Sequence, residues 1–283
     1  MKETGDLCLW SSRLFEEDDT AYVDVTVASA AAEPGRDRGR ERQRRGELRV
    51  SDYGAEEFWH TRWNANSHAG YEWYTVSAAE LWPVLRPLCS ELRLCAPLPE
   101  GSAPRAVELG CGLSRICLDL AATYGVVGLV ATDVVPQAVE VLRTAAQTEG
   151  LHPPTLDFAV ENALRTSYAD RSFALVLDKG CADMFALNSD ETQLATYARE
   201  AARLTAEGGY CVVVTAWDAA RREERCKLFA PLKLLSTVLV HQMPRTRPRT
   251  DQRDGDAALG ALPATALGGM KALALLLLFM RIN

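Results

Sequence analysis

The chain has 283 residues, of which 48% are hydrophobic, and a net charge of −7, which suits one α/β core with tails better than two small domains. Its eight cysteines include no C-x-x-C pair and its four histidines no H-x-x-x-H pair, which argues against a disulfide framework, a zinc site and metal catalysis. We therefore expect a reduced intracellular protein that binds no metal.

The N-terminal stretch has neither the pattern of a secretory signal nor that of a transit peptide. Acidic residues at 16–19 interrupt it early, and no basic residues precede a long apolar run. Residues 34–49 hold seven arginines and three acidic residues, which is typical of a solvated linker. A nucleic-acid or localisation patch is the alternative, but this segment has no aromatic side chains to stack on bases. We expect residues 1–50 to form a disordered extension, residues 51–283 to form the folded domain, and nucleic acid not to be a partner.

Hydrophobic periodicity predicts alternating helices and strands along the rest of the chain. Strands are expected at 105–109, 127–132, 155–160, 173–178, 209–216, 233–242 and 271–281. Helices are expected at 76–94, 114–124, 136–149, 190–206 and 221–229. Pro136 should open its helix, and Gly208 with Gly209 should end the helix at 190–206. The alternation predicts a doubly wound α/β fold that binds ligands at the carboxyl ends of parallel strands.

The C-terminal part departs from this alternation. Residues 244–269, rich in Pro, Arg, Asp, Gly and Ala, lack clear periodicity and are expected to form a long loop insertion. Without a helix between them, the last two strands should lie side by side, with the seventh antiparallel to the sixth. The apolar stretch 272–280 is far shorter than the ~20 residues of a membrane-spanning helix. We expect no membrane association and a cytoplasmic protein, with a nuclear location as the alternative.

A glycine-containing turn follows the apolar run 106–109. Gly110 and Gly112 would let the chain turn sharply and let a ligand approach the main chain without a Cβ in the way. Asp133, 21 residues after Gly112, closes the next strand, where it could accept hydrogen bonds from ribose hydroxyls while Val134 supports an adenine. A dinucleotide motif would need glycine at position 115, where the chain has Arg115.

The segment 108–114, Glu-Leu-Gly-Cys-Gly-Leu-Ser, resembles the first motif of class I S-adenosylmethionine-dependent methyltransferases, E/D-x-G-x-G-x-G, with serine in place of the last glycine. Three further elements narrow the resemblance: Phe-Trp-x-x-Arg-Trp at 58–63, Tyr-Glu-Trp-Tyr at 71–74 and Asp-Lys-Gly-x-x-Asp at 178–183. Together, over about residues 53–217, they resemble the methyltransferase-like protein-lysine methyltransferases of elongation factor 1-alpha and of citrate synthase.

The resemblance implies a Rossmann-like seven-stranded sheet of order 3-2-1-4-5-7-6 with helices on both faces, and S-adenosyl-L-methionine as the cofactor. The residues that it assigns to cofactor binding are Trp59, Arg62, Trp73, Gly110, Cys111, Gly112, Asp133, Val134, Asn162, Ala163 and Asp178. Arg62 would pair with the carboxylate of the methionine portion, for which a guanidinium is well suited. The two tryptophans would wall the methyl-transfer pocket, where aromatic faces favour the sulfonium.

The remaining assignments follow the same motifs. Gly110 and Gly112 would sit against the methionine portion and ribose, Asp133 would hold the ribose hydroxyls, and Asn162 would meet the adenine amino group. Many relatives have aspartate where this chain has Asn162, but an amide oxygen can accept the same hydrogen bond. Core packing remains open for each tryptophan, and a helix cap before Pro136 remains open for the aspartate.

Asp178 and Lys179 are the catalytic candidates. Asp178 would accept a hydrogen bond from the cofactor's amino group or attract an incoming lysine, and Lys179 would pair with a carboxylate. Asp183 would either cap the following helix or steer the substrate.

The resemblance implies transfer of a methyl group to a lysine, or to an N-terminal amine, of a protein substrate. A small-molecule methyltransferase and a catalytically silent interaction module are the alternatives. Retention of Arg62, Gly110, Gly112 and Asp133 argues against the silent module.

Overall fold

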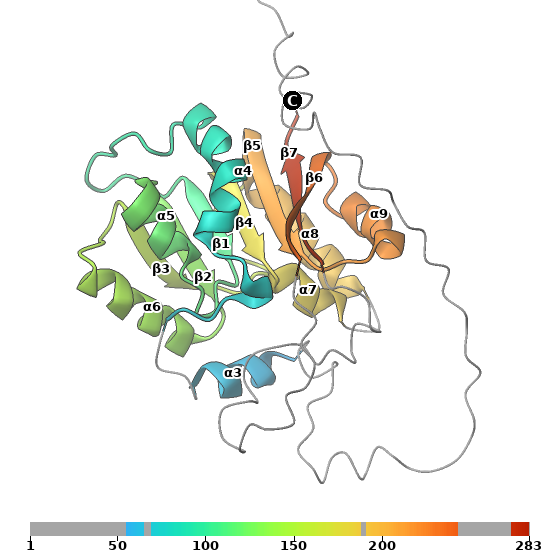
Figure 1. Cartoon of the computed structure of the whole chain (residues 1–283), viewed down its shortest axis with the longest axis horizontal. Helices are drawn as coiled ribbons and strands as arrows, with labels where there is room; N and C mark the ends of the chain where they lie inside the picture. Colours follow the sequence, from blue (N-terminus) through green and yellow to red (C-terminus); the bar gives the residue numbers. More distant parts are fainter. Residues whose placement is uncertain (1–54, 65–68, 188–190, 243–272, 283) are drawn as a thin grey trace, which may run out of the picture. The chain divides into compact units, whose positions relative to one another are not determined.

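The structure is a computed structural model, and it describes residues 55–64, 69–187, 191–242 and 273–282. The extension expected at 1–50 and the loop expected at 244–269 lie outside these residues. The strands of the described residues form one seven-stranded sheet in the order β3-β2-β1-β4-β5-β7-β6 (Figure 1). They are β1 (Ala106–Leu109), β2 (Leu129–Asp133), β3 (Leu156–Val160), β4 (Phe173–Lys179), β5 (Thr205–Thr215), β6 (Lys233–Gln242) and β7 (Leu273–Met280).

The sheet is parallel except at one strand. β1 pairs with β2 and β4, β2 with β3, and β4 with β5, all in parallel. β7 lies between β5 and β6 and is antiparallel to both. The predicted strand order, including the antiparallel last strand, is therefore confirmed.

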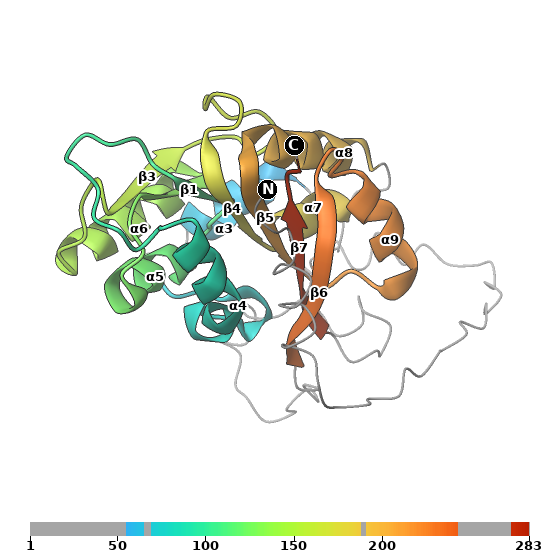
Figure 2. The same ribbon diagram turned by 90° about the horizontal axis from the view of Figure 1, so that it is seen from above.

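Helices cover both faces of this sheet, as Figures 1 and 2 show. They are α3 (Glu56–Asn64), α4 (Ala78–Glu91), α5 (Ile116–Tyr124), α6 (Pro136–Thr148), α7 (Cys181–Ala186), α8 (Thr192–Leu204) and α9 (Ala219–Lys227), with a short 3-10 turn η2 (Trp73–Thr75) before α4. Apolar residues of α4, α5 and α6 pack on one face, and those of α7, α8 and α9 pack on the other. None of the helices in the described residues is long and apolar enough to cross a membrane.

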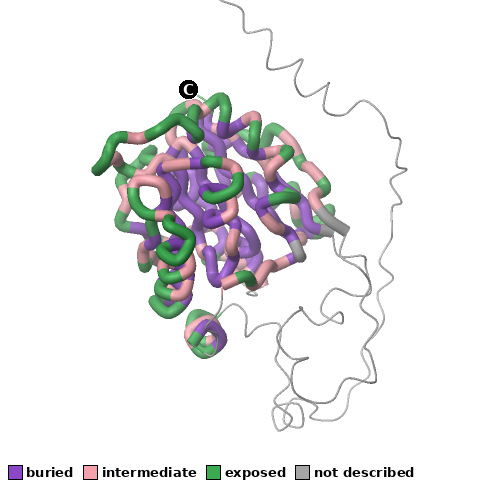
Figure 3. Tube along the Cα trace, turned by 60° about the vertical axis from the view of Figure 1, so that its left-hand side comes forward, coloured by how far each residue is buried: buried purple, intermediate pink, exposed green. Residues whose placement is uncertain are grey.

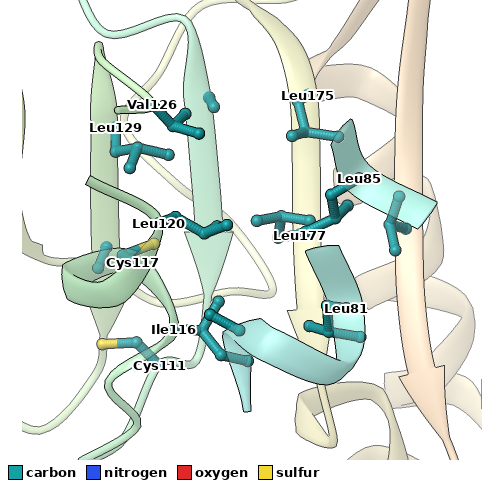
Figure 4. Packing of buried hydrophobic residues seen from close by; sticks show 14 of the residues in the cluster. Leu81, Leu85, Cys111, Ile116, Cys117, Leu120, Val126, Leu129, Leu175 and Leu177 are labelled. Carbon is teal, nitrogen blue, oxygen red and sulfur yellow. The ribbon is translucent and has the colours of Figure 1, made fainter. Parts of the chain in front are cut away.

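Alternation along the central strands explains the two cores. In β4, Leu175 and Leu177 point to the cluster under α4 and α5, whereas Val176 between them belongs to the opposite cluster. Figure 4 shows these two leucines beside Leu81 and Leu85 of α4. Because both faces are covered, the central strands are almost wholly buried, which Figure 3 shows as a continuous buried interior.

The predicted boundary between α8 and β5 was wrong. The helix ends at Leu204 and the strand begins at once with Thr205, so Gly208 and Gly209 lie within β5 and do not end the helix. Gly208 has φ +70°, and the register between β4 and β5 shifts there. A Cβ on Gly209 would lie 2.8 Å from the carbonyl oxygen of Ala174. The two glycines therefore allow a bulge in β5 at a point where its backbone lies close to that of β4.

Two helices were not predicted as elements. α3 carries the 58–63 motif, and its hydrophobic pattern is weak because its buried side chains include Arg62 as well as Trp63. α7 is only six residues long and follows β4 directly through Gly180, whose φ of +82° makes the turn. Both helices bring side chains to the site described next.

Candidate functional site

The carboxyl ends of β1, β2 and β4 border a hollow that is partly open to solvent. Nine of the residues assigned to the cofactor from the sequence line it: Trp59, Trp73, Gly110, Cys111, Gly112, Asp133, Val134, Asn162 and Ala163. Lys179 lines it as well, whereas Arg62 and Asp178 are not among the lining residues. The hollow thus lies where a doubly wound sheet is expected to bind its ligand.

The loop after β1 depends on its two glycines. Gly110 and Gly112 have φ of +65° and +53°, the region that residues with a Cβ rarely adopt. A Cβ on Gly110 would lie 2.5 Å from the sulfur of Cys181, and one on Gly112 would lie 3.0 Å from the ring of Trp63. Neither position therefore accommodates a larger residue without displacement of a neighbour.

Asp133 joins this loop to the end of β2. Its Oδ2 accepts a hydrogen bond from the backbone N–H of Gly112 at 2.8 Å, and its Oδ1 accepts one from Val135 at 2.9 Å. Burial raises the pKa of the carboxyl, and these backbone donors oppose that shift. The carboxylate both supports the start of α6 and faces the hollow, so the two roles considered from the sequence are compatible.

Beyond Asp133, the hollow is lined by the segment that follows β3. Asn162 is exposed, and its Oδ1 accepts a hydrogen bond from the N–H of Leu164 at 2.9 Å. Glu161 accepts hydrogen bonds from the backbone and the hydroxyl of Ser167. Asn162 lines the hollow, but the amide oxygen that was expected to accept from the adenine amino group already accepts the backbone hydrogen bond from Leu164.

Aromatic rings form one wall of the hollow. Trp59 lies 5.4 Å from Trp63 and 5.9 Å from Trp73, and Tyr71 lies 5.6 Å and 5.3 Å from the same two rings, measured between centroids. The guanidinium of Arg62 lies over Tyr71 at 4.9 Å and near Trp63 at 5.4 Å. Arg62 therefore supports this wall by cation–π contacts.

Glu72 is a functional candidate that the sequence analysis quoted only as part of a motif. Its Oε1 accepts a hydrogen bond from the N–H of Arg115 at 2.8 Å, and its Oε2 accepts one from the hydroxyl of Ser114 at 2.9 Å. The same Oε2 pairs with the ammonium of Lys179, whose side chain is 3% exposed. One carboxylate thus ties the segment before α4 to the cofactor loop and to the end of β4.

The two catalytic candidates have different surroundings. Asp178 accepts hydrogen bonds from the N–H groups of Cys181 and Ala182, at 3.0 and 2.9 Å, and from the hydroxyl of Tyr197, and burial raises its pKa to about 7. It therefore holds the start of α7 within the protein. Lys179 donates to Glu72 and to the carbonyl of Val76, at 3.2 Å for the latter. Burial lowers the pKa of its ammonium to about 7, a shift that the Glu72 carboxylate opposes.

Asp183 neither caps α7 nor lines the hollow. Its Oδ1 accepts a hydrogen bond from the hydroxyl of Thr215 at 2.8 Å, which ties α7 to the end of β5. The helix that Asp183 was expected to cap is α8, whose N-cap residue Glu191 makes no side-chain cap hydrogen bond. Asp178 instead caps α7, because Gly180 turns the chain so that the carboxylate three residues before this helix reaches its first amides.

Several lining residues had no signal in the sequence. Glu56 of α3, Met184 and Phe185 of α7, and Gln193 of α8 border the hollow, but each becomes recognisable only when its helix is placed against the sheet. Cys181 also lines the hollow, in the motif 178–183 that the sequence analysis had singled out. Within the described part of the chain, no group of three or more His, Cys, Asp or Glu residues could hold a metal ion.

Comparison with known proteins bears on this site. Residues 107–213 match the family model of a methyltransferase domain, and no curated protein matches the chain. The [4+2]-cyclase SpnF is 16% identical with a TM-score of 0.52, over 82% of this chain and 94% of that one. The N-methyltransferase NodS from Bradyrhizobium japonicum in complex with S-adenosyl-L-homocysteine is 16% identical with a TM-score of 0.47, over 80% and 99%. A SAM-dependent methyltransferase from Methanosarcina mazei is 17% identical with a TM-score of 0.44, over 69% and 97%.

The family match supports an S-adenosylmethionine-dependent methyltransferase of class I and indicates S-adenosylmethionine as the cofactor. At these identities, the solved structures show the fold alone. The groups around the hollow fit this cofactor: the bare Cα atoms of two glycines, a carboxylate at the end of β2, an amide after β3, aromatic faces and one ammonium.

Proposed function

We propose that the protein methylates a lysine, or an N-terminal amine, of a protein substrate. The observation that carries the proposal is the character of the hollow: aromatic side chains and the carboxylates of Glu56, Asp133 and Glu161 are among the described residues that line it. Such a lining favours a cationic acceptor, because aromatic faces and carboxylates both attract positive charge. The resemblance of the 58–63, 71–74 and 178–183 motifs to protein-lysine methyltransferases supports the same acceptor.

The bound cofactor supplies a sulfonium-activated methyl group, so the protein needs no nucleophile of its own. We assign Asp133 to the ribose hydroxyls, Asn162 to the adenine, and Trp59 and Trp73 to the walls beside the methyl group. The protein's main task is to align donor and acceptor and to exclude water, which can contribute ~7–11 kcal/mol. An aromatic lining also helps a lysine acceptor to lose its proton, because desolvation lowers the amine pKa from its reference value of roughly 10.4.

A small-molecule acceptor is the second candidate. α3 directs Trp59 and Trp63 into the hollow, so the 58–63 motif could close a small cavity and need not contact a protein. SpnF, which shares the fold, is named a [4+2]-cyclase, so the fold by itself does not specify the reaction.

A methyl-transfer assay distinguishes these acceptors. The protein is incubated with S-adenosylmethionine carrying a labelled methyl group and a cell extract, which is then separated into protein and low-molecular-weight fractions. We expect label in protein, located on a lysine or an N-terminal amine by mass spectrometry, and less label with the Asp133→Ala variant when the cofactor concentration is near the parent's Kd. Label confined to the small-molecule fraction would refute the proposed acceptor while keeping the enzyme class. A protein that binds the cofactor but labels neither fraction would favour the silent module.

A further inference from the structure

A zwitterionic cofactor brings a carboxylate that must be neutralised wherever the methionine portion lies. Of the described residues that line the hollow, Lys179 is the only lysine or arginine. Arg62, to which the sequence analysis gave this role, is not among the lining residues, and its guanidinium lies over the ring of Tyr71 at 4.9 Å. The lining thus offers a different cation for the carboxylate.

The backbone of the cofactor loop offers little to an anion. The start of a helix commonly binds anions through its first N–H groups. Here the amides around the start of α5 already donate within the protein, at 2.8 to 3.2 Å: those of Cys111, Gly112, Ser114, Arg115 and Ile116. The carboxylate of Glu72 takes the position of the anion at this helix start, through the N–H of Arg115.

Glu72 also determines where the ammonium of Lys179 lies. A lysine has three N–H donors, and Lys179 directs two of them to Glu72 and to the carbonyl of Val76. The third donor makes no hydrogen bond to a described residue. A methionine tail carries one ammonium and one carboxylate. Together with Lys179 and Glu72, these groups make two positive and two negative charges. Such a neutral set is favourable here because the lysine side chain is only 3% exposed.

We infer that Lys179, positioned by Glu72, binds the carboxylate of the cofactor's amino-acid portion. Arg62 then stabilises the aromatic wall and does not contact the ligand. Ser114, which stands where the methyltransferase motif has its last glycine, donates to Glu72 and so adds a contact that glycine could not make. The inference rests on S-adenosylmethionine as the cofactor and is independent of the acceptor.

The test combines ligand truncation with substitution. Calorimetry on the whole chain measures the affinities of S-adenosyl-L-homocysteine and of its decarboxylated counterpart, which lacks only the carboxylate. We expect Lys179→Met to lose S-adenosylhomocysteine affinity roughly 10- to 100-fold, the range of a charge-assisted contact, and to bind the decarboxylated compound like the parent. Lys227→Met, at an exposed lysine that pairs with Glu223, is the matched control and should leave both affinities unchanged.

Two further variants separate positioning from direct contact. Glu72→Gln should also lower the affinity for S-adenosylhomocysteine and leave that for the decarboxylated compound unchanged. Because Glu72 acts through the lysine, the double variant Glu72→Gln with Lys179→Met should bind S-adenosylhomocysteine as well as Lys179→Met alone does. Arg62→Met should show no preference between the two ligands. Equal losses for both ligands in Lys179→Met, or a carboxylate-specific loss in Arg62→Met, would overturn the inference. If the parent protein bound neither ligand, both this inference and the assignment of the cofactor would be refuted. If the protein bound both ligands but did not methylate a protein, the inference would stand and the proposed acceptor would be refuted.

Discussion

Replacement of Asp133 tests the cofactor site at the residue where loop and ligand meet. Its two carboxylate oxygens already accept the N–H groups of Gly112 and Val135, at 2.8 and 2.9 Å, and the side chain also lines the hollow. Each oxygen has a second lone pair, which we assign to a ribose hydroxyl. Asp133→Ala removes all these contacts, whereas Asp133→Asn keeps one oxygen acceptor and loses the charge.

The expected magnitude follows from hydrogen bonds to a charged acceptor. Loss of the ribose contacts should cost about 1.5–3 kcal/mol of binding free energy, which corresponds to roughly a 10- to 150-fold rise in the Kd for the cofactor. Two backbone amides also lose their acceptor in Asp133→Ala, so the free energy of unfolding should fall by about 1–3 kcal/mol. Asp133→Asn should lie between parent and alanine variant in both measurements.

Calorimetry with S-adenosylhomocysteine gives the affinity, and urea unfolding without ligand gives the stability. Asp157→Ala is the matched control, because Asp157 is an exposed aspartate on neighbouring β3 that does not line the hollow. It should bind the cofactor like the parent. If Asp133→Ala also retained parental affinity while folded, the assignment of the ribose to this carboxylate would be refuted.

Three further substitutions probe the framework of the site. Gly110→Ala should lower the free energy of unfolding by about 1–3 kcal/mol more than Gly150→Ala in urea titrations, because both glycines have positive φ but only the first faces a close sulfur. Tyr197→Phe removes a hydroxyl that donates to buried Asp178, and unfolding at neutral pH should become easier by about 1.5–3 kcal/mol. Burial raises the pKa of Glu108 to about 7, so its stabilising protonated form is lost as pH rises from about 4.5 to 7. Between about pH 4 and about pH 8, which lie on either side of this range, the free energy of unfolding should therefore fall less in Glu108→Gln than in the parent.

The sequence predicted those parts of the fold that depend on local pattern. The pattern of strands and helices along the chain predicted the doubly wound sheet and the antiparallel last strand, whereas the full strand order was implied by the resemblance to class I methyltransferases. The loop at Gly110 and the acid at Asp133 are likewise local features whose separation fits one βαβ unit. The bulge at Gly208 could not be predicted in this way, because a glycine pair after a helical pattern also fits a helix end, and only pairing with β4 distinguishes the two.

The site was less predictable where contacts cross between distant segments. Glu72 meets Lys179 across 107 positions of sequence, and no periodicity connects them. Arg62 and Trp63 are adjacent in a motif, yet the helix directs only the tryptophan into the hollow. Motif resemblance identified the residue types at the site, but the side that each side chain faces depended on how α3 and the 71–74 segment pack on the loop.

The serine at position 114 shows how a departure from a motif can be part of the site. Glycine at this place would leave room but no polar group, whereas the Ser114 hydroxyl donates to Glu72 at 2.9 Å and accepts the N–H of Ile116 at 3.2 Å. The hydroxyl therefore satisfies the first N–H of α5 and at the same time fixes the carboxylate that pairs with Lys179. Because the lysine is buried, its charge depends on that carboxylate. The loop residue that differs from the motif is thus connected, through one glutamate, to the only cation among the described residues that line the hollow.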